Sequence, residues 1–313
     1  MDVIALGELL IDFVQTGTTD RGSPLLAANP GGAPLNYLGA LAKYGCSCGM
    51  IGKVGADAFG RQLIQTLQEA GIAFLGQTTG EAFTTLAFVS LTRGGERSFS
   101  FARKPGADTL LRAEEVPYQR IKEARAFHFG TLSLTDEPSR SATMEAVRFA
   151  RERGVTVSFD PNYRAMLWKN ARDAREAMRW GFAHADVIKA GTDELELACG
   201  APWKEAAREL AQGGRLVFAT MGAQGCYVAG ERFQGFVEAF QVDSVDTTGA
   251  GDIFFGAAMS RMLRCGLPPG RLGGERILEA ARFGAAAAAL STKKPGGLPS
   301  IADEDEVCAL LEG

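Results

Sequence analysis

The residues with the clearest chemical potential stand in the run 246–252, whose sequence is DTTGAGD and which precedes an apolar stretch. Gly249 and Gly251 allow the backbone to turn tightly, so N–H groups around Ala250 can converge on an anion at the start of a helix, where the dipole also favours negative charge. Asp252 is the residue directly after Gly251. A carboxylate beside a phosphoryl group makes sense as the base that accepts a proton from an attacking hydroxyl. The run therefore predicts phosphoryl transfer.

Two common nucleotide-binding motifs do not fit this chain. Gly52 and Lys53 are followed by Val54, without the Ser or Thr of a Walker A loop and without its earlier glycine. In the run 246–252 the glycine pair is followed by Phe254 where a dinucleotide fingerprint needs its third glycine. With only two histidines, the chain is also poorly supplied for Ser-His-Asp hydrolysis or a His-based metal site. The sequence therefore argues against a P-loop NTPase and against a Rossmann dehydrogenase.

The run 246–252 resembles the C-terminal motif of the PfkB, or ribokinase-like, carbohydrate kinase family. A second stretch, GGAPLN at 31–36 leading to GKVGADAFG at 52–60, is similar to the N-terminal motif of that family. Because the two motifs occur in the family's order and far apart, the resemblance spans nearly the whole chain. It implies an enzyme that uses ATP and Mg²⁺ to phosphorylate a hydroxymethyl oxygen of a small sugar, with Asp252 as catalytic base and the turn at Gly249, Ala250 and Gly251 as the anion pocket.

The resemblance also implies a sugar pocket. In this family the glycines and the asparagine of the N-terminal motif line the sugar site, which implies substrate contacts from Gly31, Gly32 and Asn36. Glycine lets a polyol approach the backbone, and asparagine offers both a donor and an acceptor. Asp12 resembles the first-strand aspartate that binds paired sugar hydroxyls, although a turn cap at a strand end would also explain it.

The nucleotide and ion sites follow from the same resemblance. Thr220, Gly222 and Gly225 resemble the loop that meets the ATP phosphates, and Glu194 matches the glutamate of the Asn-x-x-Glu motif that organises Mg²⁺ through water. Gly191 stands in the place of that asparagine, so this match is incomplete. Further contacts implied for ATP are Asn162, Lys189, Gly249 and Gly251, and those implied for a monovalent cation such as K⁺ are Asp246 and Thr248. A solvated strand-end position is the alternative for Lys189.

The identity of the sugar depends on the stretch DPNYR at 160–164, which resembles the fructokinase and 2-keto-3-deoxygluconate kinase branch. Arg164 then becomes a candidate substrate contact, with a surface arginine after a proline turn as the alternative. Arg103 falls where this branch places lid residues over the sugar, and Phe99 and Phe101 would share one face of the lid. Keto-deoxy-acid kinases usually carry tyrosines beside the lid arginine, whereas this chain has Phe101 and Ala102. We therefore expect fructose; the alternatives are 2-keto-3-deoxygluconate, a nucleoside or aminoimidazole riboside, and a non-catalytic sugar sensor.

The elements that position these residues can be predicted from the alternation of short apolar runs with amphipathic stretches along the chain. This pattern predicts an α/β fold, a doubly wound and mostly parallel sheet with helices on both faces. The expected strands are 3–6, 48–51, 126–129, 155–159, 187–189 and 216–220, and the expected helices are 33–44, 58–70, 139–153 and 171–182. Two β-rich segments, 13–28 and 74–103, break the alternation and predict a small β-sheet lid inserted in one ribokinase-like domain over 1–313, with a turn at 93–95.

The amino-acid composition limits the classes of partner and the compartment that suit this chain. Lys and Arg total 33 against 37 Asp and Glu, for a net charge of −4, and no basic run suits nucleic acid. No apolar stretch is long enough for a membrane span, and the first residues lack the positive region of a signal peptide. Six scattered cysteines indicate free thiols, which favours the cytoplasm. The family resemblance adds a homodimer formed through the lid.

Overall fold

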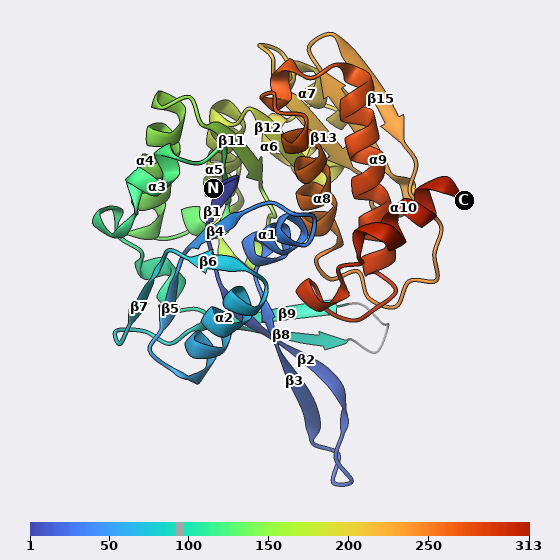
Figure 1. The fold of residues 1–313 in the computed structure, drawn as a ribbon. Helices are drawn as coiled ribbons and strands as arrows, with labels where there is room; N and C mark the ends of the chain where they lie inside the picture. Colours follow the sequence, from blue (N-terminus) through green and yellow to red (C-terminus); the bar gives the residue numbers. More distant parts are fainter. Residues whose placement is uncertain (92–96) are drawn as a thin grey trace.

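A nine-stranded sheet forms the centre of the computed structural model, which describes residues 1–91 and 97–313 (Figure 1). The strands from β13 to β6 run parallel, and β14 and β15 continue one edge in antiparallel fashion. In spatial order they are β15 (Phe233–Val237), β14 (Cys226–Gly230), β13 (Leu216–Thr220), β12 (Val187–Gly191), β11 (Thr156–Asp160), β10 (Ala126–Gly130), β1 (Val3–Leu6), β4 (Cys48–Ile51) and β6 (Ile72–Phe74).

Helices cover both faces of this sheet, because its central strands are buried apolar runs that need a partner on each side. One face carries α3 (Tyr118–Lys122), α4 (Ser139–Glu152), α5 (Ala171–His184), α6 (Thr192–Cys199) and α7 (Trp203–Leu210). The other carries α1 (Ala33–Lys43), α2 (Ala58–Glu69), α8 (Ala250–Arg264) and α9 (Gly274–Ser291), with α10 (Glu304–Glu312) packed on α9. The predicted doubly wound α/β fold is confirmed. In the part of the chain that the structure describes, no helix has the length and apolar character needed to cross a membrane.

A second, four-stranded sheet lies beside the first, with the order β3 (Pro24–Gly31), β2 (Leu10–Thr18), β8 (Thr85–Leu91) and β9 (Arg97–Ala102). The β2–β3 hairpin projects from the body of the molecule (Figure 1). Because this small sheet contributes Leu10, Asp12 and Phe101 to the lining of a cavity described below, we call it the lid. Its position next to the end of β1 follows from the chain, since β2 begins four residues after β1 ends.

The second lid segment is shorter than predicted. The expected range began at 74, but β6 joins the main sheet and β7 (Gln77–Thr79) pairs in parallel with β5 (Lys53–Gly55) in a separate two-stranded sheet. The amide of Leu75 donates to the carbonyl of Met50 and that of Gln77 to the carbonyl of Gly52, so this stretch follows β4 rather than the lid. The predicted turn at 93–95 and the side chain of Phe99 lie outside the part of the chain that the structure describes.

The order of the strands marks one place for a ligand. From β1 the chain first builds outward through β4 and β6, and then returns to β10 and builds in the opposite direction. In open α/β sheets a ligand binds beyond the carboxyl ends of the strands at such a switch point. Residues that follow β1, β10, β11 and β12 therefore converge on one region.

Candidate active site

The turn before α8 has the geometry expected of an anion pocket. Gly249 is the N-cap of α8 with a left-handed backbone, φ 74°, and a Cβ at this position would lie 2.9 Å from Nδ2 of Asn36. Both observations require glycine. The amide of Ala250 donates to the carbonyl of Thr247 at 3.3 Å, whereas the amides of Gly251 and Asp252 have no acceptor one turn earlier in the helix and are available to an anion. Asp252 stands in this first turn.

Two asparagines hold the carboxylate of Asp252. Nδ2 of Asn36, on α1, donates to Oδ2 at 3.0 Å, and Nδ2 of Asn162, just after β11, donates to Oδ1 at 3.3 Å. Asn162 itself has a positive φ of 42°. With one donor on each oxygen, the orientation of the carboxylate is fixed from two different elements. Asn162, predicted as an ATP contact, contacts the candidate base and lines the same cavity as Asp252, which is described below.

Burial sets the protonation of this carboxylate. Asp252 is 8% exposed, and its burial, together with the charge of Asp160, raises its pKa to about 6, while Lys189 and the Asn36 hydrogen bond oppose the rise. A base is most effective when its pKa lies near the working pH. The environment of Asp252 thus suits proton acceptance from a hydroxyl.

Lys189 lies beneath the anion turn. Its ammonium donates to Oδ2 of Asp160 at 2.8 Å, and a Cβ on Gly251 would lie 3.1 Å from Nζ. Burial alone would lower the pKa of Lys189, but the surrounding carboxylates of Asp160, Glu194 and Asp252 raise it above its ordinary value. Lys189 therefore stays protonated and adds positive charge next to the Gly251 amide.

A cavity of about 380 Å³ opens in front of Asp252. Of the predicted sugar contacts, Asp12, Gly32, Asn36 and Arg164 line it. Gly31 lies behind Asp12, where a Cβ would collide with the Asp12 carboxylate. The remaining lining residues are Glu8, Leu10, Ala33, Phe101, Leu132, Asn162, Thr247, Thr248, Gly249 and Asp252. The structure thus brings together residues from both predicted motifs in one cavity.

Asp12 and Arg164 carry opposite charges in this cavity. Burial raises the pKa of Asp12 to about 6, the positive charge of Arg164 opposes that rise, and Asp246 adds to it. Arg164 is exposed, and its guanidinium donates to the carbonyl of Tyr163 at 3.1 Å. A partly desolvated carboxylate facing an arginine suits the recognition of neighbouring hydroxyl groups, which need acceptors and donors together.

Arg103, predicted as a substrate contact, does not line this cavity. It is 7% exposed, and its guanidinium contacts Asp108 at 2.7 and 2.8 Å, Oγ1 of Thr135 at 2.7 Å and the carbonyl of Leu132 at 2.8 Å. The placement does not support a direct substrate contact, because the donors are already engaged in a buried ion pair. Arg103 instead holds Leu132, which lines the cavity, against the end of β9.

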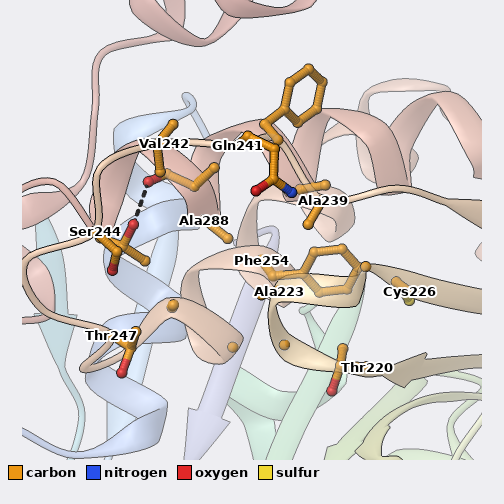
Figure 2. Close-up of a pocket in the computed structure, with 18 residues that line it drawn as sticks. Thr220, Ala223, Cys226, Ala239, Gln241, Val242, Ser244, Thr247, Phe254 and Ala288 are labelled. Atoms are coloured by element: carbon orange, nitrogen blue, oxygen red, sulfur yellow. Dashed lines mark hydrogen bonds between the residues drawn. The ribbon is translucent and has the colours of Figure 1, made fainter.

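A second cavity, of about 370 Å³, also borders the anion turn, at Ala250 and Gly251. Figure 2 shows the residues that line it. The predicted nucleotide residues Thr220, Gly222, Gly225 and Gly251 line it, and Thr247 lines both cavities. Thr220 and Thr247 lie at its lower end in Figure 2, with Phe254 and Ala223 above them. Ala250, predicted in the anion turn, also lines this cavity. The lining residues that the sequence did not indicate are Ala223, Cys226, Ala239, Phe240, Gln241, Val242, Ser244, Phe254, Ala285, Ala288, Ala289 and Thr292. Such small and apolar walls suit a flat aromatic base, and the alanine run of α9 was the available signal.

Backbone amides engage both oxygens of Glu194, the residue predicted to organise Mg²⁺ through water. Oε1 of Glu194 accepts the amide of Tyr163 and Oε2 accepts that of Gly191, both at 2.7 Å. Glu194 therefore supports the turns after β11 and β12. In residues 1–91 and 97–313, no group of three or more His, Cys, Asp or Glu side chains could hold a metal ion. The donor set thus does not fit a magnesium site held by the protein alone.

Asp246 and Thr248, predicted near a monovalent cation, contact each other. Oδ1 of Asp246 accepts the amide of Thr248 at 2.8 Å and its hydroxyl at 2.7 Å, and Oδ2 accepts the amide of Gly296 at 2.9 Å. The amide of Asp246 also donates to the carbonyl of Thr292 at 3.0 Å. These bonds fasten the start of the anion turn to the segment that follows α9.

Known proteins resemble this chain over nearly its whole length. Fructokinase-1 of Zea mays is 39% identical over 324 residues, covering 99% of this chain and 97% of the maize protein. The structure of a Xylella fastidiosa fructokinase with bound ATP matches with a TM-score of 0.89 at 33% identity, covering 99% of this chain and 98% of that one. A double mutant of the Vibrio cholerae O395 fructokinase, with fructose, ADP and a potassium ion bound, matches with a TM-score of 0.88 at 29% identity and the same coverage.

The family model of the pfkB family carbohydrate kinases matches residues 2–304. This match includes both glycine-containing motifs, the anion turn and Asp252. The chain belongs to the pfkB family of carbohydrate kinases.

Proposed function

We propose that this ATP-dependent sugar kinase acts on fructose and that Asp252 is its catalytic base. One observation carries the proposal: Asp252 lines the first cavity, and the adjoining Gly251 amide borders the second. A sugar in the first cavity and ATP in the second would therefore meet at the anion turn. Among the described lining residues, Thr247 is common to the two cavities.

The reaction follows from this arrangement. The hydroxymethyl oxygen of the sugar attacks the γ-phosphorus of ATP and its proton passes to Asp252, while the bond to the leaving oxygen of ADP breaks. The amides of the turn and the ammonium of Lys189 stabilise the negative charge that develops on the phosphoryl oxygens. Mg²⁺ would enter bound to the nucleotide, because residues 1–91 and 97–313 contain no cluster of His, Cys, Asp or Glu side chains that could hold it.

The charge of the sugar cavity favours a neutral substrate. Three carboxylates line it, those of Glu8, Asp12 and Asp252, whereas Arg164 is the one cationic side chain among its described lining residues. An added carboxylate on the substrate would meet this negative surface at a cost. Fructose is therefore favoured over 2-keto-3-deoxygluconate.

Measurement of ADP release tests this proposal. The panel is fructose, tagatose, ribose, 2-keto-3-deoxygluconate, adenosine and aminoimidazole riboside, each at several concentrations with saturating ATP. We expect the highest kcat/KM for fructose, by about tenfold or more, which corresponds to ~1.4 kcal/mol. A higher kcat/KM for 2-keto-3-deoxygluconate would contradict the neutral-substrate argument.

We also propose K⁺ as a cofactor near Asp246 and Thr248, the region that fastens the anion turn. The presence of a potassium ion in the Vibrio cholerae fructokinase supports this. Replacing K⁺ by tetramethylammonium should lower kcat several-fold, and unchanged turnover would remove the ion from the mechanism.

The lid is the proposed dimer surface. Leu25 and Leu26 on the projecting β2–β3 hairpin are 48% and 43% exposed, and β3 is an edge strand of the described lid sheet. Light scattering of the wild type should give about 66 kDa, twice the chain mass of 33.2 kDa, and Leu26→Lys should shift it toward the monomer. A monomeric wild type would exclude this assembly.

The six free cysteines support a reducing compartment such as the cytoplasm.

A further inference from the structure

Glu8 is a buried carboxylate in the sugar cavity for which the sequence motifs assigned no role. It lies two residues after the end of β1, is 3% exposed, and lines the cavity together with Asp12. Its Oε1 accepts the amide of Ala33 at 3.0 Å. Besides Ala33, the backbone amide of Glu8 itself interacts with this carboxylate. Within the part of the chain that the structure describes, no group of another residue donates to Oε2, so this oxygen can accept from a ligand in the cavity.

The bond to Ala33 explains how α1 begins. The N-cap of α1 is Gly32, which has no side chain to cap the helix and has a φ of 118°. A Cβ on Gly32 would lie 2.6 Å from the carbonyl oxygen of Glu8, so glycine lets the two segments touch. The Glu8 carboxylate then supplies the missing cap from outside the helix, at its positive end. Since α1 also carries Asn36, Glu8 helps to place the residue that holds Asp252.

No cation forms an ion pair with Glu8 among the described residues. Burial raises its pKa to about 7, with the charge of Asp108 adding to the rise and that of Arg103 opposing it. A buried carboxylate is costly unless its oxygens find partners, and the amides of Glu8 and Ala33 satisfy only part of the acceptor capacity of this one. A structural cap alone would not require a charged group at this depth, because a neutral amide oxygen can accept the same bond.

We propose that Oε2 of Glu8 accepts a hydrogen bond from a hydroxyl of the sugar, beside Asp12, and that the Glu8 charge excludes sugar acids from the cavity. The inference rests on the proposed function, since it takes this cavity to be the sugar site. Glu8 thereby becomes a residue that determines specificity: two carboxylates accept from neighbouring hydroxyls of a neutral polyol, and the same charges repel a substrate carboxylate.

The variant Glu8→Gln separates this role from the cap. Its amide oxygen can still accept from Ala33, but the negative charge is gone and the second position becomes a donor. We expect KM for fructose to rise about tenfold, with kcat within about twofold and KM for ATP unchanged. The ratio of kcat/KM for fructose to that for 2-keto-3-deoxygluconate should fall by about tenfold or more. Glu115→Gln, which alters a carboxylate bound to Lys53 outside the cavity, is the matched control and should leave both values unchanged.

Unchanged fructose KM and an unchanged ratio in a folded Glu8→Gln protein would overturn the proposal and leave Glu8 as a cap. Should this variant not fold, Glu8→Asp replaces it: a higher KM for fructose with discrimination against the sugar acid retained supports the proposal, and an unchanged KM overturns it. The fructose assignment fails separately, by the wild-type substrate panel. If another neutral sugar is preferred, the same variants are measured with that sugar, and if the wild type prefers the sugar acid, exclusion by Glu8 is overturned as well.

Discussion

Nδ2 of Asn36 and Oδ2 of Asp252 are joined by a hydrogen bond of 3.0 Å, although 216 positions separate the two residues in the chain. The bond connects the first turn of α1 with the first turn of α8, two helices that pack against each other on the same face of the sheet. The two motifs of the sequence therefore form one site. The orientation of the base depends on the packing of both helices.

Asp252→Asn should remove the base while leaving the anion turn intact. We expect kcat to fall roughly 10²- to 10⁴-fold, the usual contribution of a positioned base. ATP binding, measured by titration calorimetry, should survive, because the turn amides remain. Asp243→Asn, in the exposed segment before the motif, is the matched control and should keep wild-type turnover. A near wild-type kcat for folded Asp252→Asn would remove Asp252 from its role.

Turnover should depend on pH through the same carboxylate. Only the ionised form of Asp252 can accept a proton, and burial raises its pKa to about 6. We therefore expect kcat to be constant above about pH 7 and to fall tenfold per pH unit well below pH 6. A kcat profile at saturating fructose and ATP checks this. A constant kcat down to pH 4.5 would be inconsistent with a titrating base at this position.

The contribution of Asp252 to the free energy of unfolding should fall as the pH rises, whereas kcat should rise. The folded pKa of Asp252 is about 6, above the ordinary value of 3.8, so the folded state retains the proton more strongly than the unfolded chain. The stabilising contribution is complete below about pH 3.8 and is lost as the pH rises through 6. Asp252→Asn should therefore gain stability relative to wild type as the pH rises from 5 to 8, on the order of 1–2 kcal/mol. Urea unfolding of both proteins at each pH measures this, and a difference independent of pH would contradict it.

The main sheet and most of the site were predictable because they rest on local patterns. Buried strands such as Val3–Leu6 and Leu216–Thr220 coincide with the predicted ranges, since a parallel sheet covered on both faces needs continuous apolar runs. The glycines at 249 and 251 likewise report a backbone requirement that a sequence displays directly.

Long-range partners were not predictable in the same way. Arg103 reads as a lid cation, and only the fold shows that Asp108, Thr135 and Leu132 engage its guanidinium. The β-rich stretch at 77–79 has strand propensity, but propensity does not determine which sheet a strand joins. Glu8 was missed because a lone glutamate after a strand carries no spacing signal, and its role depends on Ala33 lying opposite.

Asp12 should be a sugar ligand rather than a turn cap. Asp12→Ala removes an ionic partner of substrate hydroxyls, which should cost on the order of 1.5–3 kcal/mol, so KM for fructose should rise roughly 10- to 100-fold. KM for ATP should not change. Asp20→Ala, at the exposed tip of the same hairpin, serves as control. A lower melting temperature with fructose KM unchanged would indicate a structural role for Asp12.

Arg103 should stabilise the folded protein through its ion pair with Asp108, and it should also position Leu132 in the wall of the sugar cavity. Its pair with Asp108 is almost completely buried, with side-chain exposures of 4% and 2%, and Asp108 also accepts a bond from Thr85 of β8 at 2.5 Å. Removing one member of a buried pair leaves the other charge without compensation, so Arg103→Met should lose about 3–5 kcal/mol in urea unfolding. Arg103→Met with Asp108→Leu removes both charges and should recover part of that loss. Because Arg103 also holds Leu132 in the cavity wall, the double variant should keep a raised KM for fructose while kcat stays close to wild type. A stable Arg103→Met protein that has lost only sugar binding would instead return Arg103 to the role of a direct substrate ligand.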